Sequence, residues 1–166
     1  MSLPQTTQGY ILGADEGEAF WFNGGLGLVK ATGAQTEGRF SVVEFRLPKG
    51  FASPVHIHRG DDEFFIVLSG DVRFQLGEEI VEGTTGSLVY GPREVPHAFH
   101  VDSPQARLLL MFGPAGTDGL FREAGRPAEA LTLPPADEPV PDRELLMKIA
   151  KSHGQEIVGP PLPPKS

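Results

Sequence analysis

The 166-residue chain contains no cysteine and carries no excess of basic residues. Without cysteine, disulfides, zinc ribbons, iron–sulfur clusters and thiol catalysis are all excluded. The chain has 14 lysines and arginines against 22 acidic residues, a formal net charge of -8, and no basic stripe. Nucleic-acid binding is therefore not expected, because the neutralisation of phosphates requires clustered cations.

Long hydrophobic runs are also missing. The longest, at residues 64–68 and 108–112, are five residues each, whereas a membrane-spanning helix needs about 20 apolar residues. The N-terminus shows neither the basic nor the apolar segment of a leader peptide, so we expect a cytoplasmic protein without membrane contact. A chain of this length is expected to form a single core.

The chain consists instead of short segments in which apolar and polar residues alternate. Residues 40–47 and 72–76 are examples, and Gly- and Pro-containing turns separate such segments at intervals of roughly ten residues. We predict an all-β sandwich or barrel over residues 1–115, with residues 10–12 as a short edge strand. The strand at 40–47 is predicted to have one face in water.

The composition changes after residue 115, since half of the 16 prolines lie beyond residue 133. Thr117 and Asp142 are predicted to cap two short helices, each ending at a glycine. The last residues, GPPLPPKS, are predicted to form extended polyproline-like chain. We therefore expect residues 116–166 to form a helical and proline-rich C-terminal extension that packs on the barrel or on a partner subunit.

Residues 50–70, GFASPVHIHRGDDEFFIVLSG, hold the first candidate metal ligands. His56 and His58 are one residue apart in a predicted strand, so both side chains project to the same side. Glu63 begins the next predicted strand, in phase with its inward-facing residues. Imidazole and carboxylate groups that converge on one side are typical ligands of first-row transition metals.

His97 is the candidate for a fourth ligand, since its strand phase matches that of the apolar residues Phe99 and Val101. A single histidine on an apolar face is usually a hydrogen-bonded core residue. Burying four polar side chains without partners, however, costs about 2–7 kcal/mol for each uncharged group. A bound metal ion offsets that cost, so the sequence favours metal binding.

The chain resembles the cupin family. The first cupin motif is matched in full by Gly50, His56, His58, Glu63 and Gly70. The second is matched by Gly86, Pro92 and His97, whereas Glu94 stands for the family's glycine and Val101 for its asparagine. The resemblance implies a small jelly-roll β-barrel in which His56, His58, Glu63 and His97 hold one divalent transition metal ion (iron, nickel, manganese, copper, cobalt or zinc).

A narrower resemblance, to single-domain bacterial quercetinase-like cupins, is carried by residues 21–40 and 113–134. In these relatives the metal binds the substrate and its glutamate ligand can accept a proton, so Glu63 is implied as the catalytic residue. Three histidines and one carboxylate leave coordination positions open for a ligand. The resemblance also implies a homodimer.

We therefore expect a metal-dependent dioxygenase that acts, with dioxygen, on a small phenolic or enolisable molecule. A metal-dependent isomerase or lyase that acts on a keto or sugar acid without dioxygen is an alternative. A non-catalytic module that binds a small ligand is another. Four inward-phase phenylalanines are expected in the core and as the wall of the substrate pocket: Phe65, Phe74, Phe99 and Phe112.

Other polar residues near the motifs receive structural interpretations. Asp61 and Asp62 are expected to be solvated turn carboxylates. Arg93 and Glu94 are expected to form a plain surface ion pair at the barrel mouth, with substrate gating as the alternative. His153 is expected to be a cation at the C-terminal end of a helix. His100, out of phase with His97, is expected at the surface.

Overall fold

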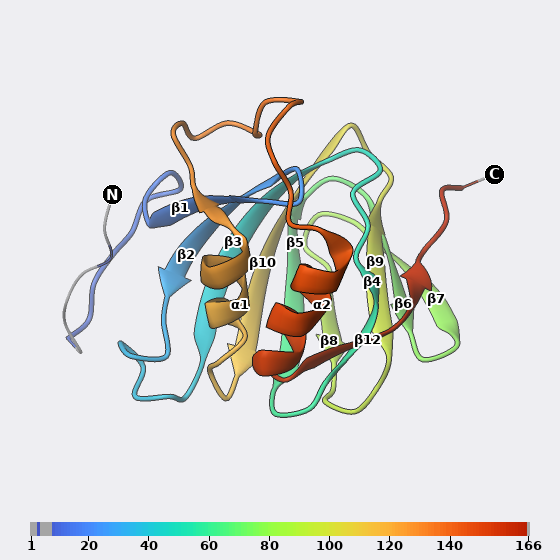
Figure 1. The fold of residues 1–166 in the computed structure, drawn as a ribbon, viewed down its shortest axis with the longest axis horizontal. Helices are drawn as coiled ribbons and strands as arrows, with labels where there is room; N and C mark the ends of the chain where they lie inside the picture. Colours follow the sequence, from blue (N-terminus) through green and yellow to red (C-terminus); the bar gives the residue numbers. More distant parts are fainter. Residues whose placement is uncertain (1–2, 4–7, 166) are drawn as a thin grey trace.

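The computed structural model describes Leu3 and residues 8–165. The predicted segments 1–115 and 116–166 also include residues 1–2, 4–7 and 166, which lie outside the described part. The described strands form two antiparallel sheets that face each other (Figure 1). The larger has the order β11-β1-β2-β3-β10-β5-β8, with β1 Glu18–Phe22, β2 Gly25–Ala31, β3 Ser41–Pro48, β5 Asp62–Ser69, β8 Leu88–Gly91, β10 Gln105–Gly113 and β11 Arg126–Pro127. The smaller has the order β12-β4-β9-β6-β7, with β4 Pro54–His58, β6 Val72–Leu76, β7 Glu79–Gly83, β9 His97–Val101 and β12 Gln155–Pro161.

The predicted all-β jelly-roll class is confirmed, in the form of a β-sandwich. The two sheets stay separate, and no ladder joins them into a closed barrel over the described residues. The predicted edge strand at residues 10–12 is wrong, because these residues form no strand and pair with neither sheet. The Tyr10 hydroxyl instead donates to the Lys30 carbonyl at 2.7 Å.

The core lies between the sheets and follows the predicted alternation. Val43, Phe45 and Leu47 of β3 are buried, since successive side chains of a strand point to opposite faces. The prediction of a wet outer face on β3 needs correction at Glu44, which is only 3% exposed. Arg107 Nη2 lies 2.8 Å from its carboxylate, so the buried charge has a partner.

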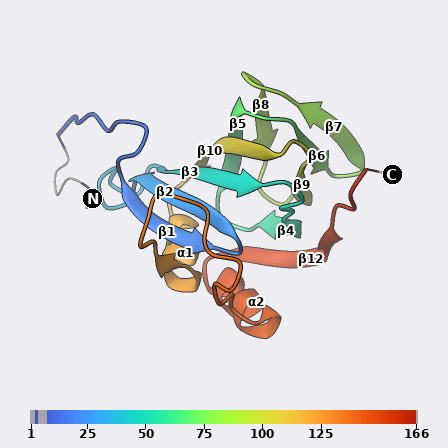
Figure 2. The ribbon, with the colours of Figure 1, turned by 90° about the horizontal axis from the view of Figure 1, so that it is seen from above.

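Two helices, α1 (Asp118–Ala124) and α2 (Arg143–Ser152), lie side by side against the sandwich (Figures 1 and 2). Asp142 caps α2 as predicted, accepting a hydrogen bond from the Leu145 amide at 2.9 Å. The predicted Thr117 cap is wrong in its chemistry: Thr117 occupies the N-cap position of α1, but its side chain makes no capping hydrogen bond. In the described chain, neither helix has the length and apolar character needed to cross a bilayer.

The C-terminal residues are part of the sandwich. Gln155–Pro161 form β12, which pairs with β4. The polyproline-like prediction for residues 159–166 is therefore wrong at residues 159–161, the part that belongs to β12. Proline is tolerated here because β12 is an edge strand whose outer side needs no ladder hydrogen bonds. Beyond it, the Pro163 carbonyl accepts a hydrogen bond from Arg73 at 2.9 Å.

His100 is buried, contrary to the surface position predicted for it. It does point away from the core, as its phase requires, and it stands opposite Arg73 across β9 and β6. The Arg73 side chain is hydrogen-bonded both to Asp102 and to the C-terminal segment. His100 Nδ1 lies 2.9 Å from Asp102 Oδ1, so the ring belongs to this polar cluster.

Candidate metal centre

Three strands bring the four predicted ligands together. His56 on β4 lies directly opposite His97 on β9, and His58 follows on the same face of β4. Glu63 reaches them from β5 in the facing sheet. One ligand atom from each residue lies within 4.8 Å of all the others, and all four side chains are buried.

The Glu63 carboxylate stands at the centre of this group. Its Oε2 lies 2.9 Å from His58 Nε2, 3.0 Å from His97 Nε2 and 3.7 Å from His56 Nε2. The three Nε2 atoms therefore converge on one carboxylate oxygen. This donor set, three imidazoles and a carboxylate, fits a divalent first-row transition ion.

The outward-facing nitrogen of each ring also has a partner. His56 Nδ1 lies 2.8 Å from the Pro54 carbonyl, and His97 Nδ1 lies 2.9 Å from the Val95 carbonyl. A carbonyl accepts only from N–H, so these contacts place the proton of both rings on Nδ1. Each Nε2 then presents a lone pair to the centre, as ligating histidines do. Lone pairs and a carboxylate that face one another form a suitable set of ligands for a cation.

His58 is oriented by a buried carboxylate. Asp61 Oδ2 lies 3.2 Å from His58 Nδ1 and accepts a hydrogen bond from Thr117 Oγ1 at 2.8 Å. Asp61 is 6% exposed and Thr117 is fully buried, so the predicted solvated turn carboxylate is wrong for Asp61. Its neighbour Asp62 remains closer to the prediction and pairs with Arg93 at 3.1 Å.

The metal-free centre holds its own compensating charges. Burial opposes protonation of His58, but the hydrogen bonds with Asp61 and Glu63 outweigh it and raise the pKa of His58 to about 10. Burial likewise opposes ionisation of Glu63, yet the three histidines hold the pKa of its carboxyl well below the ordinary value. Burial lowers the pKa of His56. An ion that binds here therefore displaces a proton from the histidines.

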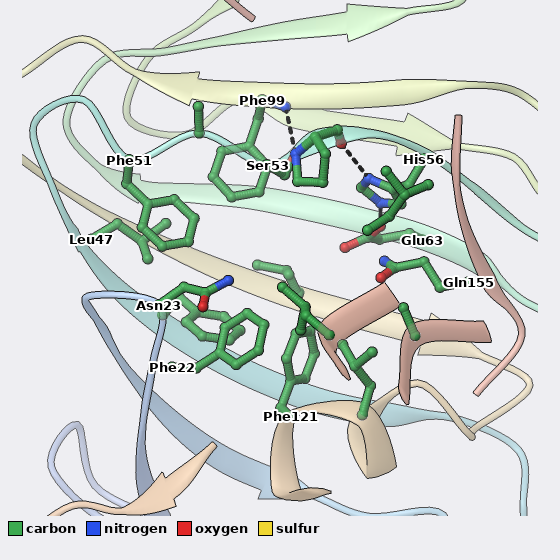
Figure 3. A pocket seen from close by; sticks show the side chains of 18 residues that line it. Phe22, Asn23, Leu47, Phe51, Ser53, His56, Glu63, Phe99, Phe121 and Gln155 are labelled. Carbon is green, nitrogen blue, oxygen red and sulfur yellow. Dashed lines mark hydrogen bonds and ion pairs between the residues drawn. The ribbon is translucent and has the colours of Figure 1, made fainter. Parts of the chain in front are cut away.

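An apolar chamber leads to the centre (Figure 3). Both sheets, both helices and β12 contribute to its wall, which contains Phe22, Phe45, Leu47, Phe51, Phe99, Leu110, Leu120, Phe121, Leu146, Ala150 and Ile157, with Asn23, Ser53, His56, Glu63 and Gln155 as polar members. The cavity volume is about 80 Å³.

Of the four phenylalanines predicted for the pocket, Phe99 lines this chamber. The others pack behind the ligands: the Phe65 ring lies 6.1 Å from the His97 ring, and the Phe112 ring lies 5.8 Å from the His58 ring. Phe74 packs against Phe65, with the ring centroids 5.2 Å apart and the rings tilted by 57°. These rings shield the site on its closed side.

Gln155 is a chamber residue that the motifs do not reveal. Its Nε2 lies 3.4 Å from His58 Nε2, and Figure 3 shows its amide beside Glu63. No sequence motif marks this position. The signal available in the sequence is the alternation of Gln155, Glu156 and Ile157, which a proline-rich context obscures.

The ion pair expected between Arg93 and Glu94 is wrong. Glu94 pairs with Arg59, and Arg93 pairs with Asp62. Glu94 has a φ of 66°, the left-handed region in which glycine is favoured, and it occupies the position of the cupin motif's glycine. His153, at the C-terminal end of α2, lies 2.8 Å from Glu123 Oε2.

Residues 43–112 match the Cupin domain family. Quercetin 2,3-dioxygenase of Bacillus subtilis is 29% identical over 134 residues, which is 81% of this chain. The chain spans only 40% of the length of that relative. An uncharacterised protein of Streptomyces coelicolor is 35% identical over 47% of this chain and 73% of its own length.

Solved structures agree on the fold. A RmlC-like cupin from Shewanella frigidimarina superposes with a TM-score of 0.57, at 19% identity, over 68% of this chain and 96% of that one. The two-sheet fold, the positions of the histidines and the glutamate, and the sequence matches agree with one another. The chain belongs to the cupin superfamily.

Proposed function

We propose that this cupin is a metal-dependent dioxygenase, quercetinase-like in its chemistry, that acts on a small phenolic or enolisable molecule. The observation that carries the proposal is the convergence of His56, His58, Glu63 and His97 at an apolar, aromatic-walled chamber. The similarity to the Bacillus subtilis quercetin 2,3-dioxygenase supports it.

Each ligand has a role in this proposal. His56, His58 and His97 would hold the ion through Nε2, with Pro54, Asp61 and Val95 fixing the rings. A divalent transition ion bound there would lower the pKa of a substrate hydroxyl and activate it toward dioxygen. Glu63, which lines the chamber, would complete the ligand set and accept the hydroxyl proton. The phenylalanine wall would exclude water.

The wall also bears on the class of substrate. Over the described residues, no lysine or arginine lines the chamber, so a keto or sugar acid would find no cationic side chain for its carboxylate. This weighs against the isomerase or lyase alternative and favours an uncharged ring or enol. At about 80 Å³, the cavity must widen for a flavonol, since pockets for drug-sized ligands measure roughly 300–1,000 Å³.

Oxygen uptake tests the proposal. Metal-free protein is loaded with iron, nickel or manganese and given flavonols or 1,3-diketones in an oxygen electrode. We expect uptake with at least one pair and none with His97→Ala, while the Asp62→Asn control keeps the wild-type rate. No uptake with any pair would refute the dioxygenase. Anaerobic turnover would favour the isomerase or lyase, and tight binding without turnover the ligand-binding module.

We also propose the homodimer that the resemblance implies. The outer face of the larger sheet carries apolar side chains across β8, β5 and β10, with Tyr90, Phe64 and Met111 in one cross-strand row. Leu88 is 63% exposed and Tyr90 45%, and such a face is typical of an interface. Leu88→Glu should shift the mass measured by light scattering to that of a monomer. A wild-type protein that is already monomeric would refute the dimer.

A further inference from the structure

The register of β12 places one polar side chain beside the metal centre. Gln155 lies directly opposite His58, and Ile157 lies opposite His56. Residues opposite each other on neighbouring antiparallel strands point to the same face. Gln155 and Ile157 therefore project into the chamber with the two histidines, whereas Glu156 projects outward.

Contacts on both sides hold Gln155 in this position. The Gly154 carbonyl accepts a hydrogen bond from the Arg59 amide at 2.8 Å, and the Glu156 carboxylate lies 2.7 Å from Arg59 Nη2. Gly154 itself has a φ of 76°, which lets the chain turn sharply from α2 into β12. Gln155 is thus presented by backbone and ion-pair contacts that do not involve its own side chain.

The Gln155 amide has an incomplete set of partners. In the described structure, its one hydrogen-bond contact is the 3.4 Å approach of Nε2 to His58 Nε2. A metal ion on His58 Nε2 uses the lone pair of that nitrogen, and the amide then needs another acceptor. An oxygen of a molecule that occupies the open side of the ion would be such an acceptor, in addition to the Glu63 carboxylate that lies beside the amide in Figure 3.

The other neutral polar residues of the wall do not serve this position. Ser53 Oγ accepts a hydrogen bond from the Phe99 amide at 3.0 Å. Asn23 belongs to the turn between β1 and β2 and lies across the chamber from Glu63 (Figure 3). Gln155 is therefore the amide best placed to meet a ligand at the centre.

We propose that Gln155 is a substrate-binding residue, whose side-chain amide donates a hydrogen bond to a substrate oxygen held at the metal centre. The inference rests on the proposed function to the extent that an oxygen ligand must bind at the ion. It makes the C-terminal strand, which lies outside both cupin motifs, part of the active site.

The test measures binding and requires no turnover. Protein loaded with Co²⁺ is titrated with 4-nitrocatechol, an aromatic diol whose absorption changes on coordination, and Co²⁺ affinity is measured separately by calorimetry. Gln155→Leu should weaken catechol binding about three- to tenfold, as expected for the loss of one hydrogen bond. Gln155→Glu should weaken it further, because a carboxylate repels the catecholate oxygen. Val158→Ala, an outward-facing change on the same strand, is the control.

In Gln155→Leu and Val158→Ala the Co²⁺ affinity and the visible spectrum before catechol addition should match the wild type. Catechol affinity within twofold of wild type in Gln155→Leu would overturn the proposal. An equal loss of Co²⁺ affinity would also overturn it, by making Gln155 a metal ligand or a structural residue. A wild type that binds Co²⁺ but no catechol would overturn it too. A wild type that binds both but consumes no oxygen would refute only the dioxygenase.

Discussion

Replacing Asp61 tests whether the hydrogen bonds around the ligands tune the metal centre. Asp61 accepts from His58 Nδ1 at 3.2 Å and from Thr117 Oγ1 at 2.8 Å, without ligating the ion itself. Asp61→Ala removes the group that fixes the tautomer and orientation of the His58 ring. Losing such a partner costs about 10–100-fold in metal affinity, which corresponds to about 1.4–2.8 kcal/mol.

The assay is calorimetric titration of metal-free protein with Co²⁺ at one pH, since protons compete for His58. Asp61→Asn keeps a carbonyl that can accept the Nδ1 proton and should lose less affinity than Asp61→Ala. Asp62→Asn is the matched control, because Asp62 pairs with Arg93 at the surface. Affinity within twofold of wild type in Asp61→Ala, or an equal loss in Asp62→Asn, would refute the role of Asp61.

Three further outcomes are expected. Phe121→Ala should lower the free energy of unfolding by about 3–5 kcal/mol, because four phenylalanine rings lie within 6.0 Å of its ring: Phe20, Phe22, Phe45 and Phe112. A urea titration in which the free energy of unfolding falls by less than about 1 kcal/mol, roughly the effect of a surface substitution, contradicts this. Deleting residues 140–166 should lower the melting temperature, since the edge of β4 loses its partner; an unchanged melting temperature would contradict this packing. Metal affinity should rise by about tenfold per pH unit below the pKa of His58, which is about 10, because the ion must displace the proton of that ring. A metal affinity that stays constant from pH 7 to 9 contradicts this expectation.

The sequence was sufficient for the strands from β1 to β10 and for the inward face of the site. The side-chain period of a strand is two, so the His-x-His spacing alone put His56 and His58 on one side. The same period placed Glu63 with the inward residues of β5. These inferences needed only local geometry, which is why the structure agrees with them.

Long-range packing decided the features that the sequence did not reveal. His100 points away from the core as its phase predicts, but the C-terminal segment reaches the same face. Arg73 is hydrogen-bonded both to that segment and to Asp102, the partner of His100. In the sequence Asp61 has the appearance of a solvated turn residue. In the fold it is buried and hydrogen-bonded to Thr117, which lies 56 residues later in the chain. β12 was missed because its prolines argue against a strand unless the strand lies at an edge.

The most direct test of the central claim is the metal content of the purified protein. Protein prepared without a chelating column is analysed by inductively coupled plasma mass spectrometry, before and after incubation with divalent transition ions. We predict about one tightly held ion per chain, and its loss in the double variant His56→Ala/His97→Ala, which should remain folded by circular dichroism. A wild type that retains no ion offered to it, or a double variant that retains as much as the wild type, would contradict the account.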